Sequence, residues 1–469
     1  MAEATTALPV LLSLVGIYLI ILANEVHSFE EMTFNLNMRK SQREQNLGCH
    51  PPEARKVKGA IILEMKDTGH CSSVSEKRSH RKQLGQDDLR VRAIQSRIRG
   101  ASASDKENKN NEIPISSGMK LETLNYVVTL GLGGQNVSMI VDTGSDLTWV
   151  QCQPCDSCYD QQGPLFQPSS SPSYQSILCN STTCRTLIPA PPGACATATN
   201  CDYVVNYGDG SYTSGELGVE HLSVGGVWIT DFVFGCGRNN KGLFGLASGL
   251  MGLGRSHLSI VSQTSSTLGG VFSYCLPSPD AGASGSLVMG NDSSSLFKNV
   301  AYARMLSDPQ LSSFYILNLT TISVGGVPLL QASSFGKGTL IDSGTVITRL
   351  APSMYRAVKA EFLRQFSDYP SAPGFSILDT CFNLTGYEEV NIPSIRLYFE
   401  EVSMNVDVSG ILYVVKEDAS RVCLAQASLS DEYDIPIVGN YQQRNQRVIY
   451  DTKNNRLGFA ADPCTFTFN

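Results

Sequence analysis

The chain has 469 residues, of which 42% are hydrophobic and 17% charged, and its formal net charge is −7 at pH 7. A chain of this length usually divides into two or more domains, and its ordinary apolar content excludes a disordered or fibrous protein. The negative charge argues against nucleic acid as a partner.

The start of the chain is typical of a secretory signal. Residues 8–23 are almost wholly apolar, and the run is short for a membrane span. We expect a signal peptide over residues 1–28 and no stable membrane insertion after its removal. The residues in front of the apolar run include Glu3 but no Lys or Arg, so a retained signal-anchor remains an alternative.

A basic stretch comes next. Residues 29–110 hold 17 Lys and Arg against 11 Asp and Glu, whereas residues 111–469 hold 19 against 30. This asymmetry predicts a detachable basic pro-segment over residues 29–115, in front of an acidic body. Within the pro-segment, Leu89, Ile94 and Ile98 stand at helical spacing, which predicts a short amphipathic helix.

The body has the pattern of an all-β protein. Short runs rich in Val, Ile, Tyr, Phe and Thr, such as "NYVVTLGLGG" and "YILNLTTISVGG", alternate with clusters of Gly, Ser, Pro and Asn. Only "SIVSQTSST" and "APSMYRAVKAEFLRQF" are predicted to be helical. We expect an N-terminal lobe over residues 116–310 and a C-terminal lobe over residues 311–469.

One phrase occurs twice in the body, as "MIVDTGSDLTWVQC" over residues 139–152 and as "LIDSGTVITRL" over residues 340–350. Each copy is followed later by an apolar segment that closes on Gly, "GLMGLG" and "IPIVGN". The repeat predicts two similar β lobes, each with one Asp loop and one apolar partner segment. A single Asp-Thr-Gly is most simply a turn. Two copies favour a pairing of Asp142 and Asp342 between the lobes.

Two carboxylates in contact do not both ionise cheaply, so such a pair holds one proton between them. The ionised member can take a proton from a shared water that attacks a peptide carbonyl, while the protonated member donates to the carbonyl oxygen. This chemistry needs no metal, no cofactor and no covalent intermediate. Glycine lets each loop turn tightly, and the neighbouring hydroxyl groups can bond across the pair or to its outer oxygens. The residues predicted to support the two aspartates are Thr143, Gly144, Ser145, Ser343, Gly344 and Thr345.

With these motifs, residues 125–464 resemble the pepsin-like aspartic proteases, and within them the plant nepenthesin-type members. The resemblance implies an all-β, bilobal pepsin-like fold, with two similar β-barrel-like lobes and the active-site cleft between them. It implies an endopeptidase that acts on polypeptide substrates at acidic pH, is made as a zymogen and is a monomer. The segment "NYGDGS" is similar to the flap hairpin of that family, with Tyr207 as the flap tyrosine and Trp149 as its partner. A plain hairpin turn is the alternative for this segment, and a core aromatic is the alternative for Trp149.

The chain has fourteen cysteines, twelve of them after residue 150, an even number compatible with disulfides in a secreted protein. The run "CQPCDSCYDQ" also begins an iron–sulfur spacing, but Gln162 stands where the fourth ligand would be. The even count and the secretory context predict six disulfides in the mature chain and no bound metal, and the resemblance implies how the cysteines pair. The implied pairs are Cys152–Cys155, Cys158–Cys236, Cys179–Cys201, Cys184–Cys195, Cys275–Cys464 and Cys381–Cys423.

Five Asn-x-Ser/Thr sequons add to the signal-like start and predict a glycoprotein of the secretory pathway. We expect it in the apoplast or the vacuole, with the plastid as an alternative. The sequons are at Asn136, Asn180, Asn291, Asn318 and Asn383.

The resemblance implies that such a pro-segment lies across the cleft as an intramolecular inhibitor, and the opposite charges of segment and body predict that they attract at neutral pH. Arg90, Arg92, Arg97 and Arg99 are the predicted contacts, and acid is expected to trigger cleavage between Arg99 and Lys120. A solvated linker without an inhibitory role is the alternative for this stretch.

Two other functions are alternatives to the protease. A serine hydrolase needs a working histidine, and the body contains only His221 and His257 and no Gly-x-Ser-x-Gly elbow. A non-catalytic binder, similar to the plant xylanase inhibitors, remains the alternative. Intact motifs around both Asp142 and Asp342 favour the enzyme.

Overall fold

The structure is a computed structural model, and it describes twelve parts of the chain. The predicted signal peptide, Cys49, Cys71, Cys195 and Asn291 lie outside these residues, as does most of the stretch in which cleavage is predicted. The described residues are 30–36, 52–57, 59–67, 80–103, 126–187, 199–207, 210–242, 244–278, 285–290, 299–329, 338–462 and 464.

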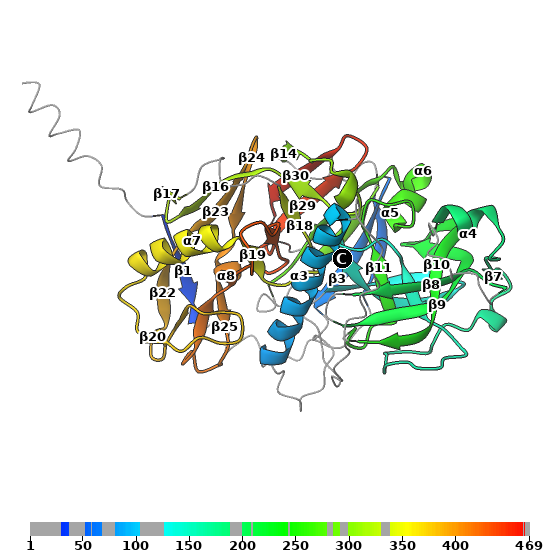
Figure 1. Cartoon of the computed structure of the whole chain (residues 1–469), viewed down its shortest axis with the longest axis horizontal. Coiled ribbons are helices and arrows are strands. Elements are labelled where there is room, and N and C mark those ends of the chain that lie inside the picture. Colours follow the sequence, from blue (N-terminus) through cyan, green and yellow to red (C-terminus); the bar gives the residue numbers. More distant parts are fainter. Residues whose placement is uncertain are drawn as a thin grey trace, which may run out of the picture.

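The fold is all-β in character and two-lobed, as the sequence predicts (Figure 1). A fifteen-stranded sheet runs through one lobe and the middle of the molecule (Figure 1), in the order β14, β30, β29, β12, β13, β3, β4, β5, β11, β6, β10, β9, β7, with β2 attached to β3 and β8 to β9. Its strands are β2 Ala54–Val57, β3 Ala60–Asp67, β4 Tyr126–Leu132, β5 Gln135–Asp142, β6 Trp149–Gln151, β7 Gln175–Ser176, β8 Asp202–Asn206, β9 Tyr212–Val224, β10 Val227–Lys241, β11 Gly249–Gly252, β12 Val271–Cys275, β13 Gly285–Met289, β14 Ala301–Arg304, β29 Gln446–Asp451 and β30 Arg456–Ala461.

Smaller sheets build the other lobe. Their orders are β15-β18-β28-β19-β27, β17-β16-β23-β24, β20-β21-β26-β25 and β1-β22. Their strands are β1 Glu31–Asn35, β15 Ile316–Leu317, β16 Leu319–Val324, β17 Val327–Pro328, β18 Thr339–Ile341, β19 Thr348–Leu350, β20 Ser371–Ala372, β21 Cys381–Phe382, β22 Glu389–Pro393, β23 Ile395–Phe399, β24 Val402–Val406, β25 Leu412–Val414, β26 Val422–Leu424, β27 Gln426–Ser428 and β28 Ile437–Val438.

Helices are few in the described part of the chain, and none of them is both long and apolar enough to cross a membrane. Both helical predictions for the body are confirmed, by α7 and by the pair α5 and α6, whereas α4 and α8 were not predicted. Pro352 begins α7, where its missing N–H costs nothing. The helices are α3 His80–Ala103, α4 Thr182–Leu187, α5 Ile260–Gln263, α6 Ser265–Leu268, α7 Pro352–Gln365 and α8 Val408–Ile411, with 3₁₀ turns at Pro168–Ser170 and Pro309–Leu311.

The doubled phrase folds the same way in both lobes. In the first, β5 runs into Asp142 and pairs in parallel with β11, which carries the segment "GLMGLG". In the second, β18 stops one residue before Asp342 and pairs in parallel with β28, which carries "IPIVGN". The strand after each Asp loop, β6 or β19, then pairs antiparallel with the same partner. The predicted pairing of each Asp loop with an apolar segment is confirmed.

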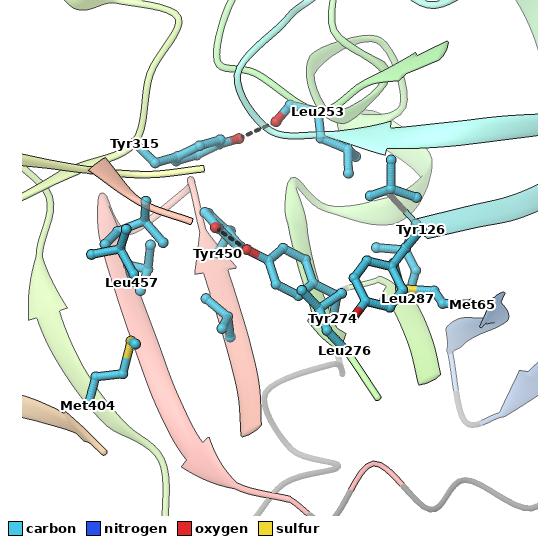
Figure 2. Packing of buried hydrophobic residues seen from close by; sticks show 14 of the residues in the cluster. Met65, Tyr126, Leu253, Tyr274, Leu276, Leu287, Tyr315, Met404, Tyr450 and Leu457 are labelled. Atoms are coloured by element: carbon cyan, nitrogen blue, oxygen red, sulfur yellow. Dashed lines mark hydrogen bonds between the residues drawn. The ribbon is translucent and has the colours of Figure 1, made fainter. Parts of the chain in front are cut away.

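A shared apolar core joins the two halves beneath the Asp loops. Figure 2 shows its aromatic centre, where Tyr315 donates to the carbonyl of Leu253 over 2.7 Å and the hydroxyls of Tyr274 and Tyr450 lie 2.7 Å apart. Interiors of this kind pack as tightly as organic crystals. The core therefore fixes the position of one Asp loop relative to the other.

The predicted pro-segment contributes strands as well as a helix. Strand β3 lies inside the large sheet between β13 and β4, with Met65 opposite Gly285 and Asp67 opposite Tyr126. Strand β1 extends the other lobe by pairing with β22. Helix α3 lies between the two lobes (Figure 1).

Candidate active site

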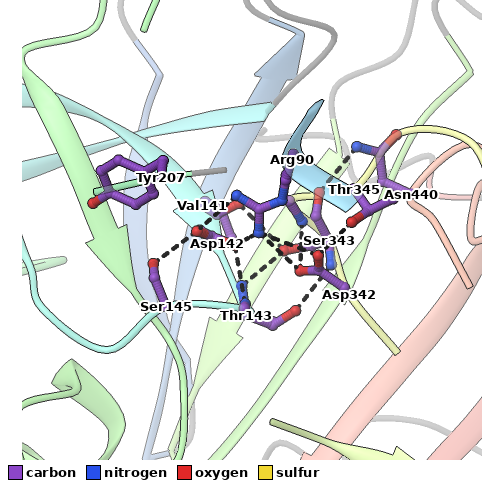
Figure 3. Close-up of polar contacts among 12 residues, drawn as sticks. Arg90, Val141, Asp142, Thr143, Ser145, Tyr207, Asp342, Ser343, Thr345 and Asn440 are labelled. Atoms are coloured by element: carbon purple, nitrogen blue, oxygen red, sulfur yellow. Dashed lines mark hydrogen bonds and ion pairs between the residues drawn. The ribbon is translucent and has the colours of Figure 1, made fainter. Parts of the chain in front are cut away.

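The two aspartates lie together between the lobes, and the same set of contacts holds each one. Asp142 accepts hydrogen bonds from the Gly144 N–H at 2.9 Å and the Ser145 hydroxyl at 2.7 Å. Asp342 accepts hydrogen bonds from the Gly344 N–H at 2.9 Å and from the Thr345 hydroxyl at 2.6 Å. Both residues are buried. The repeat in the sequence is therefore a repeat in geometry (Figure 3).

The two loops are also bonded to each other. The Thr143 N–H donates to the Ser343 hydroxyl at 3.1 Å, and the Ser343 N–H donates to the Thr143 hydroxyl at 2.9 Å. These reciprocal bonds are buried, where leaving either group unpaired would be costly. Behind them, the Asn440 side-chain amide donates to the Ser343 carbonyl at 2.9 Å. The cross-links hold the two carboxyl groups at a fixed separation.

Glycine at the third position of each phrase is required by space. A Cβ at Gly344 would lie 2.2 Å from an oxygen of Asp142, and one at Gly144 would lie 2.7 Å from an oxygen of Asp342. Real Cβ atoms do not approach other atoms so closely. Each glycine therefore leaves room for the carboxylate of the opposite loop. From the sequence, the glycines were predicted only to allow a tight turn.

Arg90 of α3 inserts between the two carboxylates (Figure 3). Its Nη2 lies 2.8 Å from Oδ1 of Asp142 and 3.1 Å from Oδ2 of Asp342. Burial alone would raise the pKa of Asp342, but the charge of Arg90 acts against this, and together with the hydrogen bonds to the carboxylate it holds that pKa below its ordinary value. The aspartates in turn raise the pKa of Arg90 against the effect of its burial. Arg90 thus favours the charged form of Asp342 and makes an ion pair with each aspartate.

The predicted amphipathic helix exists, but its buried face differs from the prediction. Leu89 is 46% exposed, whereas Ile94 and Ile98 are buried together with Val91. Leu89 is five residues from Ile94, and steps of 100° per residue place it on another side of the helix. The buried side chains pack against the body around Phe314 and form one cluster with it.

The four predicted arginines have different surroundings. Arg90 contacts both aspartates, and Arg99 lies 3.6 Å from Asp434 of the body. Arg92 pairs at 2.7 Å with Asp88 of its own helix and is 66% exposed, so it does not serve as a contact to the body. Arg90 thus makes ion pairs with both aspartates, and Arg97 lies within electrostatic range of them.

A second charged contact of α3 was not predicted. Asp87, one helical turn before Arg90, is buried and pairs at 2.8 Å with Arg349 on β19. Its carboxylate also accepts from the N–H groups of Val346 at 2.6 Å and Ile347 at 3.1 Å. Burial raises the pKa of Asp87, and Arg349 and the two N–H groups act against this. The excess of Lys and Arg in residues 29–110 directed the prediction to basic side chains, and nothing in the sequence indicated an acidic contact from this helix.

Comparison with known proteins places this geometry in a family. The family models described as xylanase inhibitor N-terminal and xylanase inhibitor C-terminal match residues 126–291 and 314–461. An aspartyl protease family protein of Arabidopsis thaliana is 41% identical over 88% of this chain and 89% of its own length. Aspartic proteinase nepenthesin-1 of Nepenthes gracilis is 34% identical over 72% of this chain and 78% of its own length. The chain belongs to the plant nepenthesin-like aspartic proteases.

A solved structure of this fold, basic 7S globulin from soybean, is 21% identical, with a TM-score of 0.60 over 74% of this chain and 96% of that chain. At this identity the likeness concerns the fold alone. It agrees with the two-lobed architecture that the sequence predicted.

The tyrosine and tryptophan that resemble the flap pair of aspartic proteases are in contact. Tyr207 follows β8 of the hairpin β8–β9, and its hydroxyl accepts a hydrogen bond of 2.7 Å from the Trp149 indole. Burial raises the pKa of Tyr207, and the nearby charge of Asp142 raises it further. The phenol therefore stays protonated across the range in which a protease of this kind would work.

Several of the disulfides implied by the family resemblance are paired differently in the structure. Cys152 bonds Cys236, and Cys155 bonds Cys158, in place of the predicted Cys152–Cys155 and Cys158–Cys236. The reason is strand pairing. β6 lies alongside β10, and the Cys152 N–H donates to the carbonyl of Gly237, so the Cα atoms of Cys152 and Cys236 are 5.3 Å apart.

The next two predicted pairs, Cys179–Cys201 and Cys184–Cys195, are also wrong, because Cys184 bonds Cys201. Cys179 is disulfide-bonded as well. The pairs Cys275–Cys464 and Cys381–Cys423 are confirmed. All three cysteines of "CQPCDSC" are in disulfides, so none is left as a thiolate for the iron–sulfur alternative.

The described sequons differ in their surroundings. Asn136, Asn180 and Asn383 are exposed, as a glycosylated side chain has to be. Asn318 is half-buried and donates to Glu400 at 2.6 Å. Glycosylation stays a prediction, and the first three sites fit it better than Asn318.

Proposed function

We propose that this protein is an aspartic endopeptidase in which Asp142 and Asp342 activate a water molecule. The observation that carries the proposal is the matched environment of the two carboxyl groups around a single shared position, which Arg90 now fills. Membership of a family whose curated members are named aspartic proteases supports it.

The chemistry follows from the pair once Arg90 leaves. Two carboxyl groups close enough to bind the same Arg90 nitrogen then hold one proton between them. The ionised group takes a proton from the bound water, whose oxygen bonds to the peptide carbonyl carbon, while the other group protonates the carbonyl oxygen. Breaking the C–N bond passes a proton to the leaving amine and restores the pair. We expect acidic conditions to favour the singly protonated pair.

The test is substitution of each carboxyl group. Asp142→Asn or Asp342→Asn should abolish cleavage of a defined peptide by the acid-treated full chain, and Asp156→Asn, an exposed carboxyl group in the same lobe, should leave cleavage unchanged. Pepstatin should block the wild-type activity. Near-wild-type cleavage by either Asp142→Asn or Asp342→Asn would contradict this mechanism.

We further propose that the described form is a zymogen, with residues 29–115 as its pro-segment and intramolecular inhibitor. Three buried contacts of α3 support this. Arg90 occupies the aspartate pair, Asp87 bonds Arg349, and Gln95 exchanges hydrogen bonds of 2.7 and 2.9 Å with the backbone of Ile435. A substrate cannot reach either aspartate while the helix is docked.

The alternative is a non-catalytic binder. It is supported by the match to family models described as xylanase inhibitor N-terminal and C-terminal. The discriminating measurement is an acid digestion of a denatured protein, with and without pepstatin, beside a xylanase inhibition assay of the same preparation. Inhibition of xylanase without pepstatin-sensitive cleavage would select the binder.

A further inference from the structure

We propose that Arg349, with the N–H groups of Val346 and Ile347, forms a substrate subsite for a carboxylate, and that Asp87 fills it in this structure. The inference rests on the proposed protease function and adds to it a preference of the mature enzyme. The ligand class is an acidic side chain, or the chain-terminal carboxylate, of a peptide bound between the lobes.

The contacts are those of a carboxylate receptor. The Val346 N–H donates to Oδ1 of Asp87, while the Ile347 N–H and the Arg349 guanidinium both donate to Oδ2, at 2.6, 3.1 and 2.8 Å. All three partners are donors, so the site has the geometry for an ionised carboxylate. Charge-assisted hydrogen bonds of this kind are roughly twice as strong as neutral ones.

The receptor belongs to the body of the protein and does not depend on α3 for its shape. The Arg349 Nη1 donates to the Ile347 carbonyl at 3.1 Å. Its strand, β19, is paired on both sides, with β27 and with β28. Departure of α3 therefore leaves the donors in place and removes their acceptor.

Arg349 would then lack an anionic partner among the contacts described for it. Its side chain is 1% exposed with α3 docked, and its Nε has no hydrogen-bond partner. A cation in so enclosed a position is costly without a counter-charge. In the mature protein, water or an anion has to take the place of Asp87, and a substrate carboxylate supplies the anion.

The site lies close to the aspartate pair. Asp87 precedes Arg90 by three residues, which is about 4.5 Å along a helix, and Arg90 marks the position of the scissile bond. An extended peptide advances about 3.3 Å per residue. The acidic residue is therefore within about three positions of the bond that is cut.

An apolar neighbour adds to the specificity of the site. Leu84, one turn earlier on the same face of α3, is buried in a cluster with Val346, Tyr413 and Tyr441. The helix thus places an apolar and an acidic side chain side by side on this lobe. A substrate with the same two side chains in adjacent subsites would make both contacts.

The test compares peptides with matched shapes. The acid-activated full chain, with its active sites counted by pepstatin titration, is given peptides that carry Glu or Gln at each of three positions on either side of the cleaved bond. At pH 5, above the ordinary Glu pKa of about 4.3, one position should show a Glu:Gln ratio of kcat/KM of roughly 10 or more, the size expected for a charged hydrogen bond. Peptides ending at that position as the acid or the amide separate a terminal from a side-chain carboxylate.

Variants assign the effect to the residue. Arg349→Gln should bring the Glu:Gln ratio toward one, Arg349→Lys should keep part of it, and Arg356→Gln, an exposed arginine on α7, should keep all of it. A wild-type ratio near one at every position, with the neutral peptides still cut, overturns the subsite and leaves the proposed protease standing. Failure to cut any peptide overturns both. The wild-type comparison decides even if the Arg349 variants do not fold.

Discussion

Arg90 and Asp87 respond to acid in opposite directions. The pKa of Asp342 is held below its ordinary value of 3.8 while Arg90 is bound, so this contact stabilises the docked helix above that pH and weakens as the pH falls below it. The pKa of Asp87 is raised in the docked state, so acid favours docking through this group. Of these two contacts, the one between Arg90 and Asp342 is therefore the one that acid weakens.

The first prediction concerns Arg90. Arg90→Gln removes the cation between two buried carboxyl groups, which should weaken docking of α3 by several kcal/mol and raise the pH at which peptide cleavage appears. Arg92→Gln removes the same charge from the exposed side of the same helix and should activate as the wild type does. Activity against pH is the measurement. Equal profiles for the two variants would show that Arg90 does not hold the zymogen.

The second prediction is the pH at which the wild-type chain becomes active. Because the relevant pKa is depressed from 3.8 by Arg90, activation should stay slow above that pH and accelerate below it. The mass and the activity of the purified full chain, followed together across a pH series, check this. Full activation at pH 6 would contradict the assignment of the trigger to Asp342.

At the scale of elements, local patterns predicted what depends on one strand or one helix. The sequence predicted the apolar run before each Asp, its partner segment and α7, because alternation and helical spacing are properties of neighbouring residues. The contacts between Asp87 and Arg349 and between β3 and β13 join residues far apart in the chain, and a single sequence carries no signal for them. The predicted disulfide pairs were wrong for the same reason. The sequence does not distinguish Cys152, Cys155 and Cys158, whereas strand pairing decides which of them lies next to Cys236.

The third prediction tests the buried face of α3. Ile94→Ala removes a side chain that packs against the body, which typically costs about 2–5 kcal/mol, so the docked helix should release more readily and activation should be faster. Leu89→Ala, on the exposed side of the same helix, serves as the matched control. The rate at which activity appears at a fixed acidic pH distinguishes them, and identical rates would mean that this face contributes nothing to inhibition.

At the scale of the whole molecule, the predicted pro-segment is part of the folded protein. Strand β3 pairs with β13 and β4 in the middle of the large sheet, and β1 pairs with β22 in the other lobe. The charge asymmetry of the sequence suggested a segment held by long-range attraction, which salt would screen. The structure adds backbone pairing and apolar burial, which salt does not weaken.

The last prediction follows from this difference. Ile61, Ile62, Leu63 and Met65 of β3 are buried, and at roughly 1.5–3 kcal/mol each their burial contributes on the order of 10 kcal/mol, an upper estimate. A single cut between α3 and β4, made at a specific protease site inserted after Ser104, should therefore leave the N-terminal fragment bound to the body at pH 7, even in 1 M salt, which screens charges beyond about 3 Å.

Size-exclusion chromatography followed by mass measurement checks this, with the uncut chain as the control. We expect both fragments in one peak at neutral pH and separate peaks only in denaturant. If the N-terminal fragment elutes alone at neutral pH after the cut, β3 does not hold the segment in place. If it separates only when salt is added, the attraction is electrostatic, as the charge pattern alone would suggest. Retention in both conditions would mean that activation requires exchange of β3 out of the sheet, beyond the release of Arg90 from the aspartates.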